Sequence, residues 1–247
     1  MDEEQVPERV HIYKVESPVK DKLESLGMLL RSLGDQSTIV FLNYRDSVER
    51  TNKYLVEQGF STSFFHGGLE QKEREASLYR FSNGSANILV STDLASRGLD
   101  IPDIDNIIHY HMPESEDGYI HRVGRTARWE AQGRAFFLLG PEEHIPDYVD
   151  AEVEDYEIPA VEELPMPAKP KMATLYIGKG KKDKISKGDI LGFLCKKGGL
   201  NSSEIGKIDV NDRYAYAAIA RPKLRSVLNN VKGEKIKGVK TIVEEVR

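Results

Sequence analysis

The stretch His121-Arg122-Val123-Gly124-Arg125-Thr126-Ala127-Arg128 places three arginines and a histidine close together, with a glycine among them. A guanidinium group is planar, permanently charged and able to bond two phosphate oxygens, so arginines three positions apart can converge on one anion. A second stretch, Thr92 to Ile101 (TDLASRGLDI), is also typical of a phosphate contact. Together the two stretches favour a phosphate-binding lobe over a solvated basic turn.

The surrounding residues, from Val10 to Leu139, alternate short apolar runs with amphipathic stretches, as strands and helices do around a parallel sheet. Leucines at helical spacing predict a helix over 23–33, which Gly34 ends. Asp46 and Glu49 predict a capping box that begins a second helix. Strands are expected at residues 38–42, 64–65, 88–90, 107–108 and 135–139.

In an open parallel sheet the working residues lie on loops at the carboxyl ends of the strands. Three polar stretches follow predicted strands: residues 43–45, 66–68 and 92–100. The arginine cluster is expected on a short helix that begins near Ser115 and Glu116. We therefore predict one functional edge on an α/β lobe.

Charge divides the chain into segments. Residues 1–140 carry 16 Lys/Arg against 22 Asp/Glu, residues 141–171 carry 2 against 10, and residues 172–247 carry 17 against 8. We predict an N-terminal linker (1–9), the lobe (10–140), an acidic, proline-containing linker without a folded element (141–172) and a basic domain (173–247). A basic domain on an acidic body indicates an anionic partner. The acidic linker is either solvating charge or a segment that competes with RNA for that domain.

Cysteine content and hydropathy exclude two classes of protein. Cys195 is the only cysteine, so the sequence excludes a disulfide-stapled scaffold. No apolar run approaches the roughly 20 residues that cross a bilayer. We expect a soluble, cytoplasmic protein with no membrane partner.

The motifs of residues 10–140 resemble the second RecA-like lobe of DEAD-box RNA helicases. Residues 38–45 are similar to motif IV of that family, His66-Gly67-Gly68 with Gln71 and Arg74 to motif IVa, residues 92–101 to motif V, and residues 119–128 to motif VI. In that family, ATP is hydrolysed between two lobes that close on RNA. The resemblance implies a RecA-like, parallel-sheet lobe.

The resemblance also implies roles by position in ATP hydrolysis. Arg125 and Arg128 would be catalytic arginine fingers that reach the γ-phosphate, and Asp100 would bond the ribose hydroxyls. Arg97, His121 and Arg122 would couple the lobe to the facing lobe and to motif V. We single out no metal ligands in this chain.

For RNA, the resemblance implies contacts from Arg45, His66, Gly67, Gln71, Arg74 and Thr92. Such contacts grip sugar and phosphate without reading bases, and they weaken as salt rises. Each residue also has a plainer interpretation: His66 as a turn histidine, Arg74 as a surface charge, Thr92 as a strand-end cap.

Two features that the family needs for ATP are missing from this sequence: the G-x-x-x-x-G-K-[S/T] phosphate loop and the Asp-Glu-Ala-Asp motif. We therefore expect ATP and Mg²⁺ to be held by an N-terminal RecA-like lobe that is missing here, and this chain alone to be inactive. Two residues depart from the family pattern: Tyr44 replaces a small threonine, and Trp129 replaces a small residue.

The basic domain is expected to have the order β-α-β-β-α-β over residues 174–246. It resembles the RNA-binding domain of DbpA-type helicases, a small α+β variant of the RRM fold, in residues 178–184, 188–192, 205–208 and 235–238. Tyr176, Tyr214 and Tyr216 would form a base-stacking face, or simply pack on the sheet. Lys179, Lys181, Lys182 and Lys184 would clasp phosphate, or form a solvated loop.

The whole pattern predicts the C-terminal part of an ATP-dependent RNA helicase. By resemblance it remodels structured RNA, namely large-subunit ribosomal RNA during ribosome assembly, and acts as a monomer. One alternative is a non-catalytic RNA-binding or adaptor protein. Another is a helicase acting on messenger RNA with a non-specific tail.

Overall fold

The computed structural model describes residue 6 and residues 9–96, 103–126 and 132–247. The described chain divides into two compact units: residues up to Leu78 with Asn87–Lys169, and Tyr79–Ala86 with Pro170–Arg247. The predicted lobe lies mostly in the first unit and the basic domain in the second. Residues 141–169, expected to be a linker, lie in the first unit.

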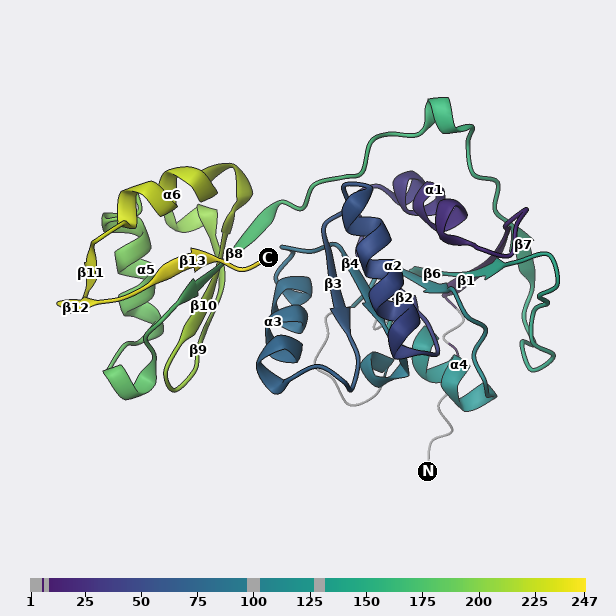
Figure 1. Ribbon diagram of the computed structural model, residues 1–247, viewed down its shortest axis with the longest axis horizontal. Helices are drawn as coiled ribbons and strands as arrows, with labels where there is room; N and C mark the ends of the chain where they lie inside the picture. The colour runs from purple at the N-terminus through teal and green to yellow at the C-terminus, as the bar shows by residue number, and fades with distance from the viewer. Residues whose placement is uncertain (1–5, 7–8, 97–102, 127–131) are drawn as a thin grey trace. The chain divides into compact units, whose positions relative to one another are not determined.

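A parallel sheet of seven strands organises the described residues of the first unit (Figure 1). The spatial order is β3-β4-β2-β5-β6-β1-β7. The strands are β1 (Val10–Glu16), β2 (Thr38–Phe41), β3 (Thr62–Phe65), β4 (Ile88–Ser91), β5 (Asn106–His109), β6 (Gly133–Leu139) and β7 (Val153–Asp155). The helices are α1 (Leu23–Leu33), α2 (Arg45–Glu57), α3 (Gln71–Ser82) and α4 (Glu116–Val123), with short 3-10 helices η1 (Asp93–Ser96) and η2 (Val161–Glu163). The end of α3, from Tyr79 onward, is counted with the second unit.

The predicted strands and the first helix are confirmed. Strands β2, β4 and β5 are buried along their whole length, because a parallel sheet covered on both faces needs apolar side chains on both sides. Helix α1 buries its leucine face and ends at Gly34, whose φ of 64° suits a residue without a Cβ. This side of the sheet forms one core with residues of α2.

The predicted capping box at Asp46 and Glu49 is wrong. Helix α2 begins at Arg45, and its N-cap is Tyr44, whose side chain makes no capping hydrogen bond. Asp46 instead lies in the first turn, where its negative charge suits the helix dipole. The Glu49 carboxylate is 2.9 Å from Nε2 of His66.

Residues 141–169, hereafter the strap, contain more structure than predicted. At its start, Glu143 pairs with Nζ of the buried Lys22 at 2.7 Å. Strand β7 then adds to the sheet beside β1, and the Tyr156 ring meets the Phe136 ring edge-on at 5.1 Å between centroids. The segment was expected to lack a folded element because three-residue strands leave no readable period. The strap therefore packs on the lobe's core through the partly buried Tyr156 and Ile158.

We predict that Tyr156→Ala lowers the free energy of unfolding of the lobe by about 1–3 kcal/mol, because it removes a half-buried ring from an aromatic cluster. Urea denaturation of the chain measures this loss. Tyr156→Phe is the matched control: it removes only the hydroxyl, 3.1 Å from Ser32 Oγ, and should cost about 1 kcal/mol or less. Equal losses in both variants would contradict a packing role for the ring.

The second unit contains a four-stranded antiparallel sheet in the order β13-β8-β10-β9 (Figure 1). Its elements are β8 (Met172–Ile177), η3 (Lys181–Asp183), α5 (Lys187–Lys196), η4 (Ser202–Glu204), β9 (Ile205–Val210), β10 (Ala215–Ala220), η5 (Arg221–Lys223), α6 (Leu224–Val231) and β13 (Val243–Glu245). The predicted β-α-β-β-α-β order is confirmed. A short hairpin that was not predicted precedes β13. It pairs two strands of two residues each, β11 (Lys235–Ile236) and β12 (Val239–Lys240).

Candidate functional site

The carboxyl ends of β3, β4, β2 and β5 lie side by side at one edge of the parallel sheet. Backbone hydrogen bonds join the loops that leave these ends: Thr92 N–H donates to Phe65 O, and Leu42 N–H donates to Ser91 O. The stretches at residues 43–45, 66–68 and 92–93 therefore come together, as the sequence predicts for this fold.

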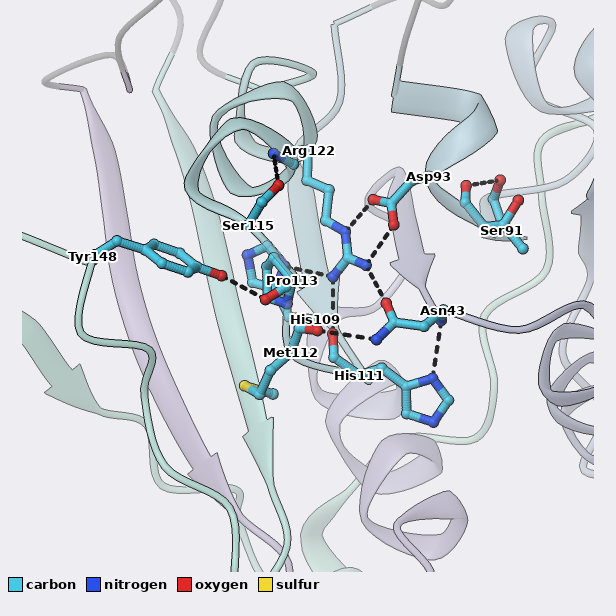
Figure 2. Close-up of polar contacts among 12 residues, drawn as sticks. Asn43, Ser91, Asp93, His109, His111, Met112, Pro113, Ser115, Arg122 and Tyr148 are labelled. Atoms are coloured by element: carbon cyan, nitrogen blue, oxygen red, sulfur yellow. Dashed lines mark hydrogen bonds and ion pairs between the residues drawn. The ribbon is translucent and has the colours of Figure 1, made fainter.

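A fully buried arginine, Arg122, lies at the centre of this edge (Figure 2). Its Nε and Nη2 donate to the two carboxylate oxygens of Asp93 at 2.5 and 3.0 Å. Its Nη2 also donates to Asn43 Oδ1 at 2.7 Å, and Nη1 donates to His111 O at 2.8 Å. One side chain of α4 is thus tied to the ends of β4, β2 and β5, and it links the 119–128 stretch to the 92–101 stretch.

Asn43 and His111 complete this network. The backbone N–H of Asn43 donates to Nδ1 of His111 at 2.9 Å, and its side-chain amide donates to Met112 O at 3.1 Å. Because Nδ1 of His111 accepts a hydrogen bond, its ring is held in the neutral form. Burial, aided by the charges of Lys22 and Arg122, lowers the pKa of His111 to about 4.

His109 is fully buried under the same arginine. Its Nδ1 lies 3.3 Å from Arg122 Nη1, a donor, so the ring proton is assigned to Nε2, which has no hydrogen-bond partner among the described residues. The ring stacks on Phe137 at 4.5 Å. Burial, with a smaller contribution from the Arg122 charge, lowers the pKa of His109 well below its usual value.

Because the pKa values of His109 and His111 are lowered in the folded lobe, we predict that the lobe loses stability as the pH falls. The folded lobe disfavours the charged form of each ring, whereas the unfolded chain protonates it near pH 6.5. Below that pH the unfolded state binds more protons, so the free energy of unfolding falls by up to about 1.4 kcal/mol per pH unit for each such histidine. Urea denaturation between pH 7 and 5 measures the slope. His109→Asn should make this slope shallower, and a slope equal to that of the unaltered chain would contradict the assignment.

The loop after β3 contacts the start of α2. A Cβ atom added to Gly67 would lie 2.9 Å from Arg45 Nη2, so the lack of a side chain at Gly67 leaves room for the guanidinium in this position. His66 is buried, accepts the Gly68 N–H at Nδ1 and meets Glu49 at Nε2. Both ring nitrogens are therefore engaged, one within the turn and one by Glu49 of α2, which fits the plainer interpretation of His66 as a turn histidine.

The remaining predicted RNA contacts lie on neighbouring elements. Gln71 begins α3, and its Oε1 accepts a hydrogen bond from Arg74 Nη2 at 3.0 Å. Thr92 directly follows β4 and is half-buried. The edge thus presents Arg45 beside the 66–68 turn and Arg74 on α3, the helix that follows this turn.

The turn after α4 holds Arg125. Its backbone N–H donates to Arg122 O, and its carbonyl accepts from Ile104 N–H. These two bonds fix the backbone of the turn that follows the buried Arg122. The Arg125 side chain is half-buried, and His121 is 3.6 Å from Asp117 on α4. Arg97, Asp100, Arg128 and Trp129 lie outside the described residues.

In the second unit the three predicted tyrosines come together, but Tyr214 lies just before β10 and Tyr216 is only 2% exposed, so the expectation that Tyr216 offers an open stacking face is wrong. Tyr176 on β8 is paired in register with Tyr216 on β10, and the Tyr176 and Tyr214 rings stack at 5.9 Å. The lysine loop joins the turn that precedes β10: Lys181 N–H donates to Asn211 O, and Lys182 N–H donates to Asp212 O. A Cβ atom at Gly180 would lie 2.1 Å from Asn211 O, so only glycine permits this approach.

Comparisons with known proteins agree with both units. The model of the helicase conserved C-terminal domain matches residues 21–130, and that of the DbpA RNA binding domain matches residues 174–245. The ATP-dependent RNA helicase DbpA of Escherichia coli is 35% identical over 228 residues, which cover 90% of this chain and 50% of the relative. The E. coli DEAD-box protein SrmB, solved bound to regulator of ribonuclease activity A, superposes with a TM-score of 0.57 at 29% identity, over 66% of this chain and 99% of that one.

The chain thus combines a helicase C-terminal domain with a DbpA RNA binding domain. DbpA of Bacillus subtilis is a further relative, 30% identical over 245 residues that cover 89% of this chain and 51% of that protein. The chain spans about half the length of these DbpA relatives.

Within this lobe, sequence reasoning missed two residues of the Arg122 network. His109 and His111 were not singled out, and Asn43 was named only as part of the 43–45 stretch, although each lies at or just after the end of a strand of the functional edge. Their position was the available signal, because polar side chains that follow buried apolar residues meet at this edge. No helix in the part of the chain that the structure describes has the length and apolar character needed to span a membrane.

Proposed function

We propose that this chain is the C-terminal part of an ATP-dependent RNA helicase that remodels large-subunit ribosomal RNA during ribosome assembly. The observation that carries the proposal is the succession, in one chain, of a helicase C-terminal domain and a DbpA RNA binding domain. The basic charge of residues 172–247 supports an RNA partner for the second domain. We place the protein in the cytoplasm as a monomer.

In this proposal, Arg125 and Arg128 act as arginine fingers and Asp100 bonds the ribose of ATP. A bound ATP with Mg²⁺ supplies the phosphoryl group that is transferred to water, and positive charge at the γ-phosphate stabilises that transfer. The half-buried Arg125, in a turn fixed by backbone bonds, fits this task. No group of three or more His, Cys, Asp or Glu side chains suited to a metal occurs among the described residues. We assign Mg²⁺ to the facing N-terminal RecA-like lobe.

Arg97 and His121 would couple the two lobes, whereas the fully buried Arg122 would couple residues 119–128 to residues 92–101. The pair of Arg122 with Asp93 supports the role of Arg122, because it joins α4 to the loop after β4. A shift of either element would break two charge-assisted hydrogen bonds, so the two elements are expected to move together.

RNA would cross the carboxyl edge of the lobe. Arg45, Arg74 and Gln71 would contact phosphates, and Gly67 and Thr92 would contribute backbone and hydroxyl groups. His66 would act through the turn that it holds, because both ring nitrogens are engaged. These contacts are sequence-independent and salt-sensitive.

The second domain would bind an RNA hairpin and so target the lobe. Tyr176 and Tyr214 would stack bases, and the buried Tyr216, 2% exposed, would support their rings edge to face. Lys179, Lys181, Lys182 and Lys184 would bind phosphates. The backbone bonds between the lysine loop and the turn before β10 support a joint surface, because they hold the lysines near the aromatic group. Tethering raises the local concentration of RNA duplex at an otherwise indiscriminate lobe.

The test is a titration of labelled ribosomal hairpin, and of a scrambled hairpin of equal length, at two salt concentrations. The chain is compared with a version ending at Lys169, which keeps the strap that packs on the lobe. We expect tight binding that prefers the ribosomal hairpin and depends on the second domain. Equal binding of both hairpins, lost at high salt, would contradict the ribosomal assignment. RNA-stimulated ATP hydrolysis by this chain alone would contradict the division of labour between lobes.

A further inference from the structure

One large aromatic side chain at the functional edge is left unused by the proposed function. Tyr44, the N-cap residue of α2, is 61% exposed and directly precedes Arg45. The Arg45 guanidinium lies against Gly67, so Tyr44 adjoins the surface assigned to RNA. A single exposed aromatic residue is common on protein surfaces and needs no explanation by itself. The orientation of the Tyr44 ring and its effect on the stability of α2 therefore decide whether it serves binding.

The orientation of the Tyr44 ring is restricted. It meets the ring of His111 at 5.6 Å between centroids, with an interplanar angle of 63°. His111 is itself held, because its Nδ1 accepts the Asn43 N–H and its ring lies against Tyr110 at 5.3 Å. The tyrosine thus rests edge to face on a fixed support, and its exposed surface is available as a platform.

Tyr44 also leaves the N-terminus of α2 without a capping hydrogen bond from its N-cap side chain. Its φ of −129° and ψ of 142° are those of an N-cap residue, at which Ser, Thr, Asp or Asn would accept an N–H from the first turn of the helix. A tyrosine cannot reach these groups, and no side chain supplies the bond at this described helix start. The position gives up helix stability without burying the ring, a pattern expected where a residue serves binding.

We infer that Tyr44 is a stacking contact for a base of single-stranded RNA, next to the phosphate held by Arg45. Stacking uses the face that every base has, so this contact strengthens binding without adding a sequence code. The inference rests on the proposed function, which brings RNA to this edge, and adds a base contact to a surface otherwise limited to sugar and phosphate.

The test uses the full chain and a single-stranded oligouridine in which 5-iodouridine replaces uridine, since irradiation cross-links this base to a stacked aromatic ring. Cross-linked peptides are mapped by mass spectrometry. We expect a cross-link at Tyr44, retained in Tyr44→Phe and reduced at least fivefold in Tyr44→Thr. Because threonine restores a capping side chain, the Tm of Tyr44→Thr should equal or exceed that of the unaltered chain.

Val56→Thr is the matched control, because Val56 is 53% exposed at the other end of the same helix and should leave the cross-link unchanged. RNA that binds and cross-links elsewhere, with none at Tyr44, would overturn the inference and leave the proposed function standing. A chain that binds no RNA would overturn both. A Tm of Tyr44→Thr well below that of the unaltered chain would show that the tyrosine serves the fold, and would also overturn the inference.

Discussion

Replacing Arg122 with methionine is expected to lower the free energy of unfolding of the lobe by about 3 kcal/mol, measured by urea denaturation. The variant removes a fully buried guanidinium that donates to Asp93, Asn43 and the His111 carbonyl. Methionine fills part of the volume but removes these hydrogen bonds. Because the Asp93 side chain is 43% exposed, water can solvate its carboxylate, which keeps the loss at the lower end of the range for broken buried pairs.

Arg50 is the matched control for this prediction. Its Nη2 lies 2.6 Å from Asp21 Oδ2, nearly the same distance as in the buried pair, but the two side chains are 60% and 56% exposed. Arg50→Met should therefore cost no more than about 1 kcal/mol. Equal losses in the two variants would show that burial does not set the strength of the Arg122 network.

The sheet and the first helix could be predicted because their burial leaves a direct pattern. Both faces of β2 and β4 are covered, so each strand contains three consecutive apolar residues, and α1 buries one face of leucines at helical spacing. Such patterns depend only on the environment of each side chain. They can therefore be recognised in the sequence without knowing which residues are neighbours in space.

The strap and the start of α2 could not be predicted for the opposite reason. Strand β7 has three residues, and it is recognised only by its partner β1, which is far away in sequence. The acids at 46 and 49 fit a capping box in spacing, but Glu49 bonds to His66 on another loop. Long-range partners override local signals at both places.

The candidate site was predictable at the level of loops. The edge that unites the 43–45, 66–68 and 92–93 stretches follows from the parallel sheet alone. The partners of Arg122 do not, because a motif does not show which of its arginines is buried. Arg122 is inaccessible and structural in its contacts, whereas Arg125, three residues on, is half-buried in a turn. Because of this difference, the unfolding of the lobe tests the role of Arg122, and ATP hydrolysis tests the role of Arg125.

For Arg125→Ala, RNA-stimulated ATP hydrolysis by the helicase containing both lobes is expected to fall by about 10³- to 10⁵-fold, the usual contribution of an arginine finger. The turn keeps its backbone bonds to Arg122 and Ile104, so the free energy of unfolding should change by about 1 kcal/mol or less. Arg122→Met should lower both activity and stability. If Arg125→Ala instead lowers stability as much as Arg122→Met while ATP hydrolysis per folded molecule is retained, Arg125 is a structural residue of the turn and the finger assignment fails.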